Sequence, residues 1–356
     1  MKPFLPTVFL LVALLGQPIR MFAFETDQYN LPPTPLADIG DEVAEYAEEN
    51  LLKAIAKINA EIVRLNECRQ TEDGCDPQPS LQRRLAYLRS EEAVARGLYN
   101  LVGSGFMAST KAGSWMDSHK FRGQPARYKT NFSRSIFIYL PSNYFTISPT
   151  VKMYGHSFGT DKIAHLFQQG YTYYRIYRRA KAEGRSESES TKEAVDWGRK
   201  TEFTYYGTLV SGVFSNADLA ANFAGMQFYL GLAKPVTVGG RLHPAAVVLA
   251  DGRWKMNTDL AARKELLSPF ISDHLNEALN PSLYIPGLRS AIRGIVRKQS
   301  CGGWKAAYPT LAGDQFEVLT NSLALWNGVD YGHKASKKFV TIASTCFATK
   351  SNSPPS

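Results

Sequence analysis

Apolar residues recur three or four positions apart along much of the chain, the spacing of a helix with one buried face. The segment 36–66 has such a stripe between acids and lysines, formed by Val43, Leu51, Ile55, Ile58, Ile62 and Leu65. A second stripe begins after Pro79 or Ser80 and comprises Leu81, Leu85, Leu88, Val94, Leu98 and Leu101. Two such helices joined by a short loop predict a helical hairpin.

The central stretch 155–232 predicts three more helices. Thr160 is a suitable N-cap for the first, whose packed face is Ile163, Leu166, Phe167, Gly170 and Tyr174. Ser190 and Glu193 have the spacing of a capping box and predict the start of the second. The third starts near Ser215 or Asn216. Its alanines and Gly225 leave room for a neighbouring helix to approach closely.

The remaining segments predict short strands and further helices. Strands are expected at 134–140, 145–147, 151–153 and 339–345, and a hairpin at 245–256 that turns at Asp251-Gly252. Helices are expected at 260–279, 288–296 and 314–326. The fold class is therefore mainly α: a helical core with an N-terminal helical hairpin and a few short strands in the middle and C-terminal parts.

Charged and amide side chains stand out within the apolar central stretch. Asp161 and His165 are four residues apart, so they share a helix face, and Lys162 lies between them. Glu202 ends the second helix. Between Glu202 and Lys234 the only acid or base is Asp218. If Asp218 is buried, its carboxylate needs a partner, because an unpaired buried charge is costly. His165 or Lys162 is the expected partner.

Asn222 and Gly225 follow Asp218 at helical spacing and complete the set. The candidate site is therefore Asp161, Lys162, His165, Glu202, Asp218 and Asn222. Two interpretations are open. The set is either a binding or catalytic site, or a structural network whose pairing fixes the register of the helices.

The order Asp-Lys-x-x-His, a glutamate on a later helix, and Asp-x-x-x-Asn-x-x-Gly resembles the VanZ-like proteins and the YfiM-type predicted periplasmic lipoproteins. The resemblance covers the central stretch alone. It implies a bacterial envelope protein, and for the VanZ-like family a membrane helical bundle linked to glycopeptide resistance without settled chemistry. The helices here are shorter and more polar, with Gln168, Gln169 and a basic run at 175–181.

The N-terminus has the pattern of a secretory signal peptide: Lys2, an apolar run at 4–15 and a small residue at Ala23. Cleavage after Ala23 would remove Lys2 and Arg20 and lower the formal net charge from +9 to +7. We expect a periplasmic or envelope-associated protein. No cysteine lies near the expected cleavage site, which argues against a lipoprotein anchor.

Four cysteines in an exported chain indicate two disulfides. The favoured pairs are Cys68 with Cys75 and Cys301 with Cys346. The expected segments are a signal peptide (1–23), the disulfide-tipped hairpin (24–102), an irregular short-strand segment (103–154), the central helical domain with the polar site (155–233), a basic α+β region (234–350) and a disordered tail (351–356).

The amino-acid composition favours some classes of binding partner over others. A hydrophobic content of 44% indicates a packed core, and the segment after residue 280 holds nine bases and three acids. Such a region suits anionic lipid or an envelope glycan, and association with a membrane surface. Nucleic acid is not expected, because the chain has no recognisable binding motif. The residues leave the cofactor, any metal and the oligomeric state open.

Two functions follow from these observations. The first is an exported hydrolase or transferase acting on an envelope lipid or glycan, with His165 as base or nucleophile and Asp161 orienting it. Glu202 or Asp218 would be the second acid–base group, and Lys162 would hold an anionic group. The same carboxylates with imidazole would also suit a divalent metal.

The second function is a non-enzymatic envelope protein that binds lipid, glycan or a protein, with recognition on the basic C-terminal region or on a tyrosine-rich face (Tyr171, Tyr173, Tyr174, Tyr177).

Overall fold

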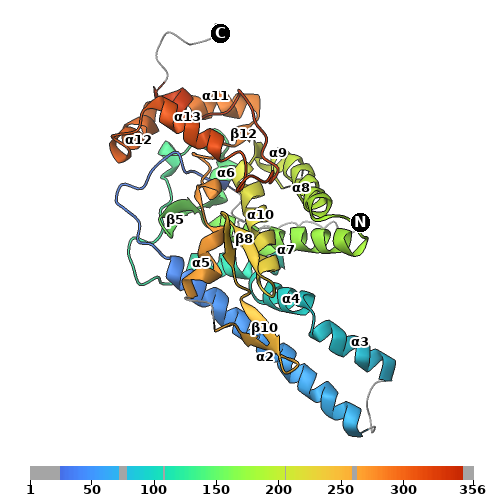
Figure 1. The fold of residues 1–356 in the computed structure, drawn as a ribbon. Coiled ribbons are helices and arrows are strands. Elements are labelled where there is room, and N and C mark those ends of the chain that lie inside the picture. The colour runs from blue at the N-terminus through green and yellow to red at the C-terminus, as the bar shows by residue number, and fades with distance from the viewer. Residues whose placement is uncertain (1–24, 72–77, 107–108, 205, 259–262, 348–356) are drawn as a thin grey trace, which may run out of the picture.

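A computed structural model describes residues 25–71, 78–106, 109–204, 206–258 and 263–347, and it is mainly α, as predicted (Figure 1). The expected signal peptide and C-terminal tail lie outside these residues, as does Cys75 of the first expected disulfide. The strands of the described residues form two-stranded sheets between helices. Helices therefore supply most of the core.

The N-terminal hairpin consists of α2 (Gly40–Thr71), α3 (Gln78–Leu88) and α4 (Glu91–Val102), and it extends from the body of the molecule (Figure 1). The second arm of the hairpin is two helices, α3 and α4, instead of the single helix expected. The chain breaks at Ser90, which is the N-cap of α4: its side chain accepts a hydrogen bond from the Ala93 N–H at 3.4 Å. The two apolar stripes are buried as predicted, except that Leu101 is half-buried.

The centre of the molecule is built from α7 (Thr160–Ala182), α8 (Glu187–Phe203) and α10 (Asn216–Gly231). The N-cap of α7 is Gly159 instead of Thr160, and α10 begins after Ser215 as expected. The capping box predicted for α8 is wrong by one turn. It is formed by Ser186 and Glu189, and the Ser190 hydroxyl donates to the Ser186 carbonyl at 2.7 Å.

Helices α7 and α10 pack closely because glycines face each other between them. A Cβ on Gly170 would lie 2.6 Å from the carbonyl carbon of Gly225, and one on Gly225 would lie 2.8 Å from Gly170 Cα. Real side chains do not approach this closely, so both positions require glycine. The close approach lets the Tyr229 hydroxyl donate to the Phe167 carbonyl at 2.8 Å.

Short strands connect this centre to distant parts of the sequence. The parallel pair β1 (Glu25–Thr26) and β4 (Ile147–Ser148) lies beside the antiparallel pair β5 (Thr150–Met153) and β6 (His156–Gly159), which leads into α7. The strand expected at 151–153 is β5. A further pair joins β7 (Val213–Phe214), just before α10, to β12 (Leu283–Tyr284).

The strand predicted at 134–140 is wrong. The segment forms η1 (Phe132–Arg134) and successive turns, with Ile136 and Phe137 buried. The buried Asp27 carboxylate accepts the Ile136 N–H at 3.0 Å, which satisfies this backbone group without a sheet. The strand expected at 145–147 is also displaced, because α6 (Pro141–Phe145) takes up its first residue.

Of the elements predicted beyond residue 240, the hairpin is present as β10 (Val247–Ala250) and β11 (Arg253–Met256). Asp251 and Gly252 both have positive φ, 53° and 72°, as a tight hairpin turn requires. Further short elements of the fold are β2 (Gly105–Phe106), β3 (Ser109–Thr110), α5 (Lys111–Ser118), β8 (Val236–Val238) and β9 (Arg241–His243).

Two of the later predictions are wrong. The helix expected at 260–279 is a series of short 3₁₀ turns, η2 (Arg263–Leu266), η3 (Ser268–Phe270) and η4 (Asp273–Leu275), because Pro269 interrupts it. The final strand is instead the helical turn η6 (Ala343–Phe347), which the Thr341 hydroxyl starts by accepting the Ser344 N–H at 2.9 Å.

The C-terminal helices form a second apolar core with the start of the described chain. They are α11 (Pro286–Ile295), η5 (Val296–Ser300), α12 (Cys301–Ala307) and α13 (Gly313–Ser322). The predicted disulfide between Cys301 and Cys346 is present, with an S–S distance of 2.00 Å. Trp304 is fully buried and donates its indole N–H to the Tyr29 carbonyl at 2.8 Å.

The glycine contact between α7 and α10 yields the first prediction. Gly170→Ala should lower the free energy of unfolding by about 1–3 kcal/mol or more, because the methyl group would overlap backbone that cannot easily move. The measurement is urea denaturation followed by circular dichroism. Gly287→Ala in α11 is the matched control, since nothing lies within 4 Å of a Cβ there. Equal effects of the two substitutions would contradict the close packing.

Candidate functional site

The ammonium group of Lys162 lies at the point where three carboxylates converge. Its Nζ is 2.5 Å from Asp161 Oδ2, from Asp218 Oδ1 and from Glu277 Oε1. Lys162 and Glu277 are 0% exposed, Asp218 is 1% exposed and Asp161 is 3% exposed. We call these four residues the Lys162 centre. An ammonium has three N–H donors, so each donor can be matched to one carboxylate.

Each carboxylate comes from a different place in the fold. Asp161 and Asp218 stand in the first turns of α7 and α10, where the free N–H groups of a helix favour a negative charge. Glu277 follows the short turn η4. Its backbone N–H is held by the side-chain oxygen of Gln28, at 2.6 Å. The Thr26 hydroxyl donates to Asp161 Oδ1 at 2.8 Å, which connects β1 to the same centre.

Two more buried glutamates surround the Lys162 centre. Glu25 accepts a hydrogen bond from the Ser211 hydroxyl at 2.6 Å, and Glu202 accepts one from the Ser215 backbone N–H at 2.9 Å. Burial raises the pKa of both well above the ordinary value, and neighbouring carboxylates raise it further, Glu277 for Glu25 and Asp218 for both. Their surroundings therefore disfavour the ionised form of both glutamates.

Within the Lys162 centre the carboxyl groups differ. Burial raises the pKa of Glu277 to about 8, reinforced by the charges of Asp218 and Asp161 and opposed by Lys162. Burial also acts to raise the pKa of Asp218, but the neighbouring His165 and Lys162 outweigh it and leave that pKa below its usual value. For Lys162, burial acts to lower the pKa, yet the surrounding carboxylates hold it well above the ordinary value. Lys162 is thus a permanent cation.

His165 lies at the edge of this arrangement. Its Nδ1 is 3.0 Å from Asn222 Oδ1, and its Nε2 is 3.5 Å from Asp218 Oδ2. The side chain is 13% exposed, more than any side chain of the Lys162 centre. Both ring nitrogens therefore face oxygen atoms of α10 side chains. Asn222, one turn beyond Asp218 on α10, fixes the orientation of the imidazole.

The six residues selected from the sequence thus lie in one region. Lys162 pairs with Asp218 as expected, and His165 contacts both Asp218 and Asn222. Glu202 reaches the group through the Ser215 backbone. The structure does not pair His165 with Asp161, the partner expected from the helical spacing: Asp161 bonds Lys162 and Thr26 instead.

Sequence reasoning missed two of the buried acids, Glu25 and Glu277. Glu277 is an isolated acid between apolar residues and asparagines, the same signal that identified Asp218, but it lay in a segment interpreted as an ordinary helix. Glu25 lies just after the segment expected to be a signal peptide, and no sequence pattern identified it. His156 belongs to a different contact, with its Nδ1 2.7 Å from Asp273 Oδ1.

The prediction that a tyrosine-rich face lies exposed and binds a ligand is wrong. Tyr171, Tyr173 and Tyr174 are at most 5% exposed and belong to the main apolar core. Tyr171 stacks on Tyr99 of α4 with ring centroids 4.2 Å apart. These rings attach the hairpin to the central helices, which accounts for their spacing.

The oxygens of Asp161, Asp218 and Glu277 lie within 4.8 Å of one another, a spacing that would also suit a divalent cation. The Lys162 ammonium already stands 2.5 Å from each of them. A metal ion could bind there only by displacing this side chain. The geometry therefore matches a lysine held by three acids better than a metal site.

Comparison with protein-family models, curated proteins and solved structures gives no match. The VanZ-like and YfiM-type resemblance therefore stays a prediction. In the described part of the chain, none of the helices combines the length and the apolarity that crossing a membrane requires.

The raised pKa of Glu277 predicts a pH-dependent stability. The folded protein keeps this proton up to a pH of about 8, whereas the unfolded chain releases it near the ordinary value of 4.5. Between these values the folded state binds more protons, so the free energy of unfolding falls as pH rises, by about 1.4 kcal/mol per pH unit for one proton. Glu277→Gln mimics the protonated acid and should remove that share of the slope.

Urea denaturation of wild type and Glu277→Gln between about pH 5 and about pH 8 measures this slope. The variant should gain stability relative to wild type as pH rises. Glu49→Gln, at an exposed position of α2, is the matched control and should follow the wild-type curve. A Glu277→Gln curve parallel to that of wild type would contradict a buried protonated Glu277.

Lys162 itself yields a third prediction. Lys162→Met should cost about 3–5 kcal/mol of stability at neutral pH, because the buried carboxylates lose their cation. Lys192→Met is the control, since Lys192 is paired with Asp196 on the surface of α8 and such pairs contribute little. Chemical denaturation compares the two variants. Similar small losses in both would show that the Lys162 centre does not hold the helices together.

Proposed function

We propose that this protein is a non-enzymatic bacterial envelope protein that binds anionic lipid at its surface, and that the Lys162 centre fixes the helices behind that surface. The observation that carries the proposal is an apolar area left exposed beside a basic side chain, Lys334. It consists of Phe203 at the end of α8, Leu209 and Val210 in α9 (Thr208–Ser211), and Ile285, and we call it the α9 patch.

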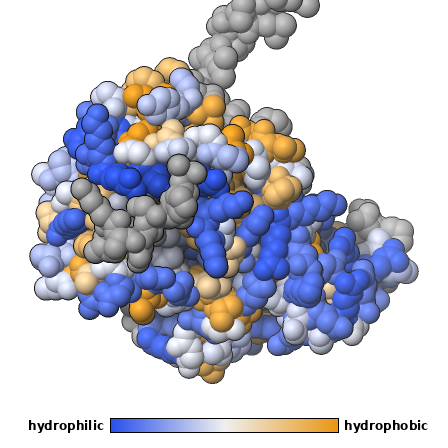
Figure 2. Space-filling view, turned by 90° about the horizontal axis from the view of Figure 1, so that it is seen from above, coloured by the Kyte–Doolittle hydropathy of each residue, from blue (hydrophilic) through white to orange (hydrophobic). Residues whose placement is uncertain are grey.

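The members of the α9 patch are joined by local contacts. The Leu209 N–H donates to the Thr204 carbonyl at 3.1 Å, and the Ile285 N–H donates to the Gly212 carbonyl at 3.0 Å. Leu209 is 76% exposed, Phe203 55%, Val210 49% and Ile285 43%. Figure 2, which views the molecule from above, shows apolar areas beside strongly polar ones. Exposed apolar groups gathered in this way indicate an interaction surface.

Positive charge lies beside these apolar side chains. The Lys334 ammonium is 5.0 Å from the centroid of the Phe203 ring and 5.1 Å from that of Phe214. The whole chain carries a formal net charge of +9, with bases in excess after residue 280. Apolar side chains next to lysine and arginine are the combination that binds the interface of an anionic bilayer.

The hydrolase or transferase is less well supported by the geometry. A substrate would have to reach acids that are at most 3% exposed, and the Lys162 ammonium already fills the space between them. Both nitrogens of His165 face protein groups. A glycan partner loses its main support because three of the four tyrosines proposed to bind it, Tyr171, Tyr173 and Tyr174, are buried. Lipid binding therefore ranks first among the functions predicted from the sequence.

Sedimentation with vesicles tests the proposal. The protein should bind vesicles containing phosphatidylglycerol more strongly than vesicles of phosphatidylcholine alone, and added salt should weaken the binding. Leu209→Asp should reduce binding about tenfold or more, since burying one leucine contributes about 1.5–3 kcal/mol. Leu242→Asp is the matched control, because Leu242 is 66% exposed in β9, outside the α9 patch.

Glu277→Gln should leave vesicle binding unchanged if the Lys162 centre has a structural role. Equal binding to both vesicle types, or full binding by Leu209→Asp, would refute the proposed lipid surface. Loss of binding in a folded Glu277→Gln protein would instead assign the function to the centre.

A further inference from the structure

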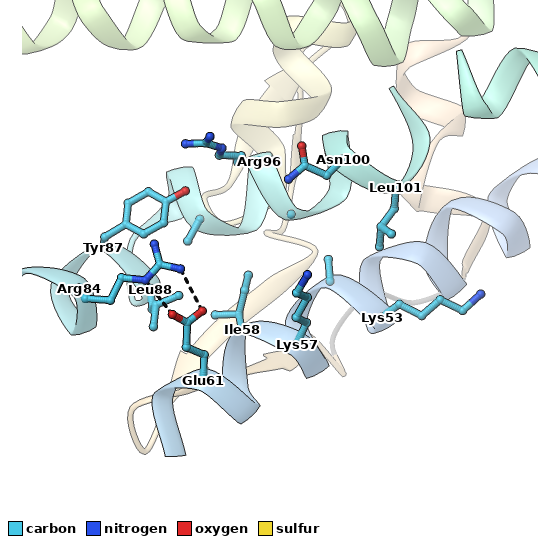
Figure 3. Close-up of a pocket in the computed structure, with 13 residues that line it drawn as sticks. Lys53, Lys57, Ile58, Glu61, Arg84, Tyr87, Leu88, Arg96, Asn100 and Leu101 are labelled. Atoms are coloured by element: carbon cyan, nitrogen blue, oxygen red, sulfur yellow. Dashed lines mark hydrogen bonds and ion pairs between the residues drawn. The ribbon is translucent and has the colours of Figure 1, made fainter. Parts of the chain in front are cut away.

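A cavity of about 530 Å³ opens between α2, α3 and α4, in the N-terminal hairpin (Figure 3). Its floor is apolar, formed by Ala54 and Ile58 of α2, Leu88 of α3 and Ala93 of α4. The helices come close there because Gly97 faces Ala54: an added Cβ would lie 3.2 Å from the Ala54 Cβ. We call this cavity the hairpin groove.

Basic side chains surround the hairpin groove from both sides. Lys53 and Lys57 come from α2, Arg84 from α3 and Arg96 from α4, against a single acid, Glu61. Arg84 is occupied, since its Nε and Nη2 donate to the two carboxylate oxygens of Glu61 at 2.8 and 2.9 Å. Figure 3 shows this ion pair at one end of the groove and Lys57 pointing from α2 toward α4.

Two cations of the groove are free to bind a ligand. Within the described residues, neither Lys57 nor Arg96 makes an ion pair or a side-chain hydrogen bond. Lys53 has only a long contact to Glu49, at 3.8 Å between exposed side chains. A site with an apolar floor and unpaired cations above it suits a molecule with an apolar body and an anionic head.

The dimensions of the groove indicate what kind of molecule this is. A volume of about 530 Å³ is within the range of small-ligand sites. Along α2 the lining runs from Lys53 to Glu61, which is about 12 Å at 1.5 Å per residue. This is little more than two helical turns, too short for the roughly 800 Å² that each partner buries in a stable protein interface. A partner helix therefore fits less well than a small amphiphile.

We propose that the hairpin groove binds one single-chain anionic amphiphile, a fatty carboxylate, with the acyl chain on the apolar floor and the head held by Lys57 from the α2 side and by Arg96 from the α4 side. A guanidinium donates two parallel hydrogen bonds to a carboxylate, which fits this head group. The inference rests on the proposed lipid-binding function and names a site for a single lipid molecule, separate from the α9 patch.

Isothermal titration with laurate, below the concentration at which it forms micelles, tests the site. The wild-type protein should bind laurate, and dodecylamine, with the same chain and the opposite charge, should bind at least tenfold more weakly. The double variant Lys57→Gln/Arg96→Gln should also weaken laurate binding at least tenfold. Arg83→Gln, which changes an exposed base of α3 outside the groove, should bind laurate like wild type.

Thermal unfolding of the same variants separates loss of the site from loss of the fold, because both should melt like wild type without ligand. No laurate binding, or equal binding by the double variant, would overturn the inference. So would preferential binding of an acidic amphipathic peptide that the double variant loses. If the groove fails but Leu209-dependent vesicle binding persists, the proposed function stands. If both binding reactions are absent, both proposals fail.

Discussion

The fold depends on one buried cation. Among the described residues, the Lys162 ammonium is the buried positive charge that five buried carboxyl groups surround, and three of these lie 2.5 Å from it. Asp161 brings the start of α7 to this point and Asp218 brings the start of α10, while Glu277 anchors a turn more than 100 residues away. An unpaired charge in such a place costs several kcal/mol, so arrangements of these helices that separate the lysine from its acids are strongly disfavoured. The glycine contact of Gly170 with Gly225 acts on the same pair of helices by shape instead of charge.

The acids around Lys162 outnumber the cations, and burial opposes their ionisation. Burial and the neighbouring carboxylates raise the pKa of Glu25 and Glu202 well above the ordinary value, and the pKa of Glu277 to about 8. The pKa of Asp218 is instead lowered, by His165 and Lys162. This division of roles follows from position. The two aspartates stand in the first turns of α7 and α10, where the free N–H groups of a helix favour negative charge.

Local patterns predicted local structure, and tertiary contacts decided the rest. The buried stripe from Val43 to Leu65 and the Asp-Gly turn of β10–β11 could be predicted from the sequence, because hydrophobic periodicity and turn-forming residues act over a few positions. The strand predicted around Ile136 failed because a distant carboxylate, Asp27, satisfies its backbone. The candidate site was half predicted: an isolated Asp218 required a partner, and Lys162 is that partner. Glu25 could not be found, because only the pairing of β1 with β4, across more than 100 residues, brings it to the centre.

The division between a sealed polar centre and polar surfaces elsewhere bears on function. A buried network that holds α7 and α10 in register leaves recognition to the surface of the molecule. The helices of the hairpin groove supply neither Lys162 nor any of the five carboxyl groups, whereas the α9 patch adjoins the network, since the Ser211 hydroxyl of α9 donates to Glu25. The hairpin groove is formed by α2, α3 and α4, and the α9 patch by the end of α8, α9 and Ile285 (Figure 1). Tyr171 stacked on Tyr99 attaches the hairpin to α7, so the groove is carried on a helix that the Lys162 centre positions. The close α2–α4 contact at Gly97 sets the separation of the helices that form the groove, and a site shaped before its ligand arrives loses less free energy to ordering.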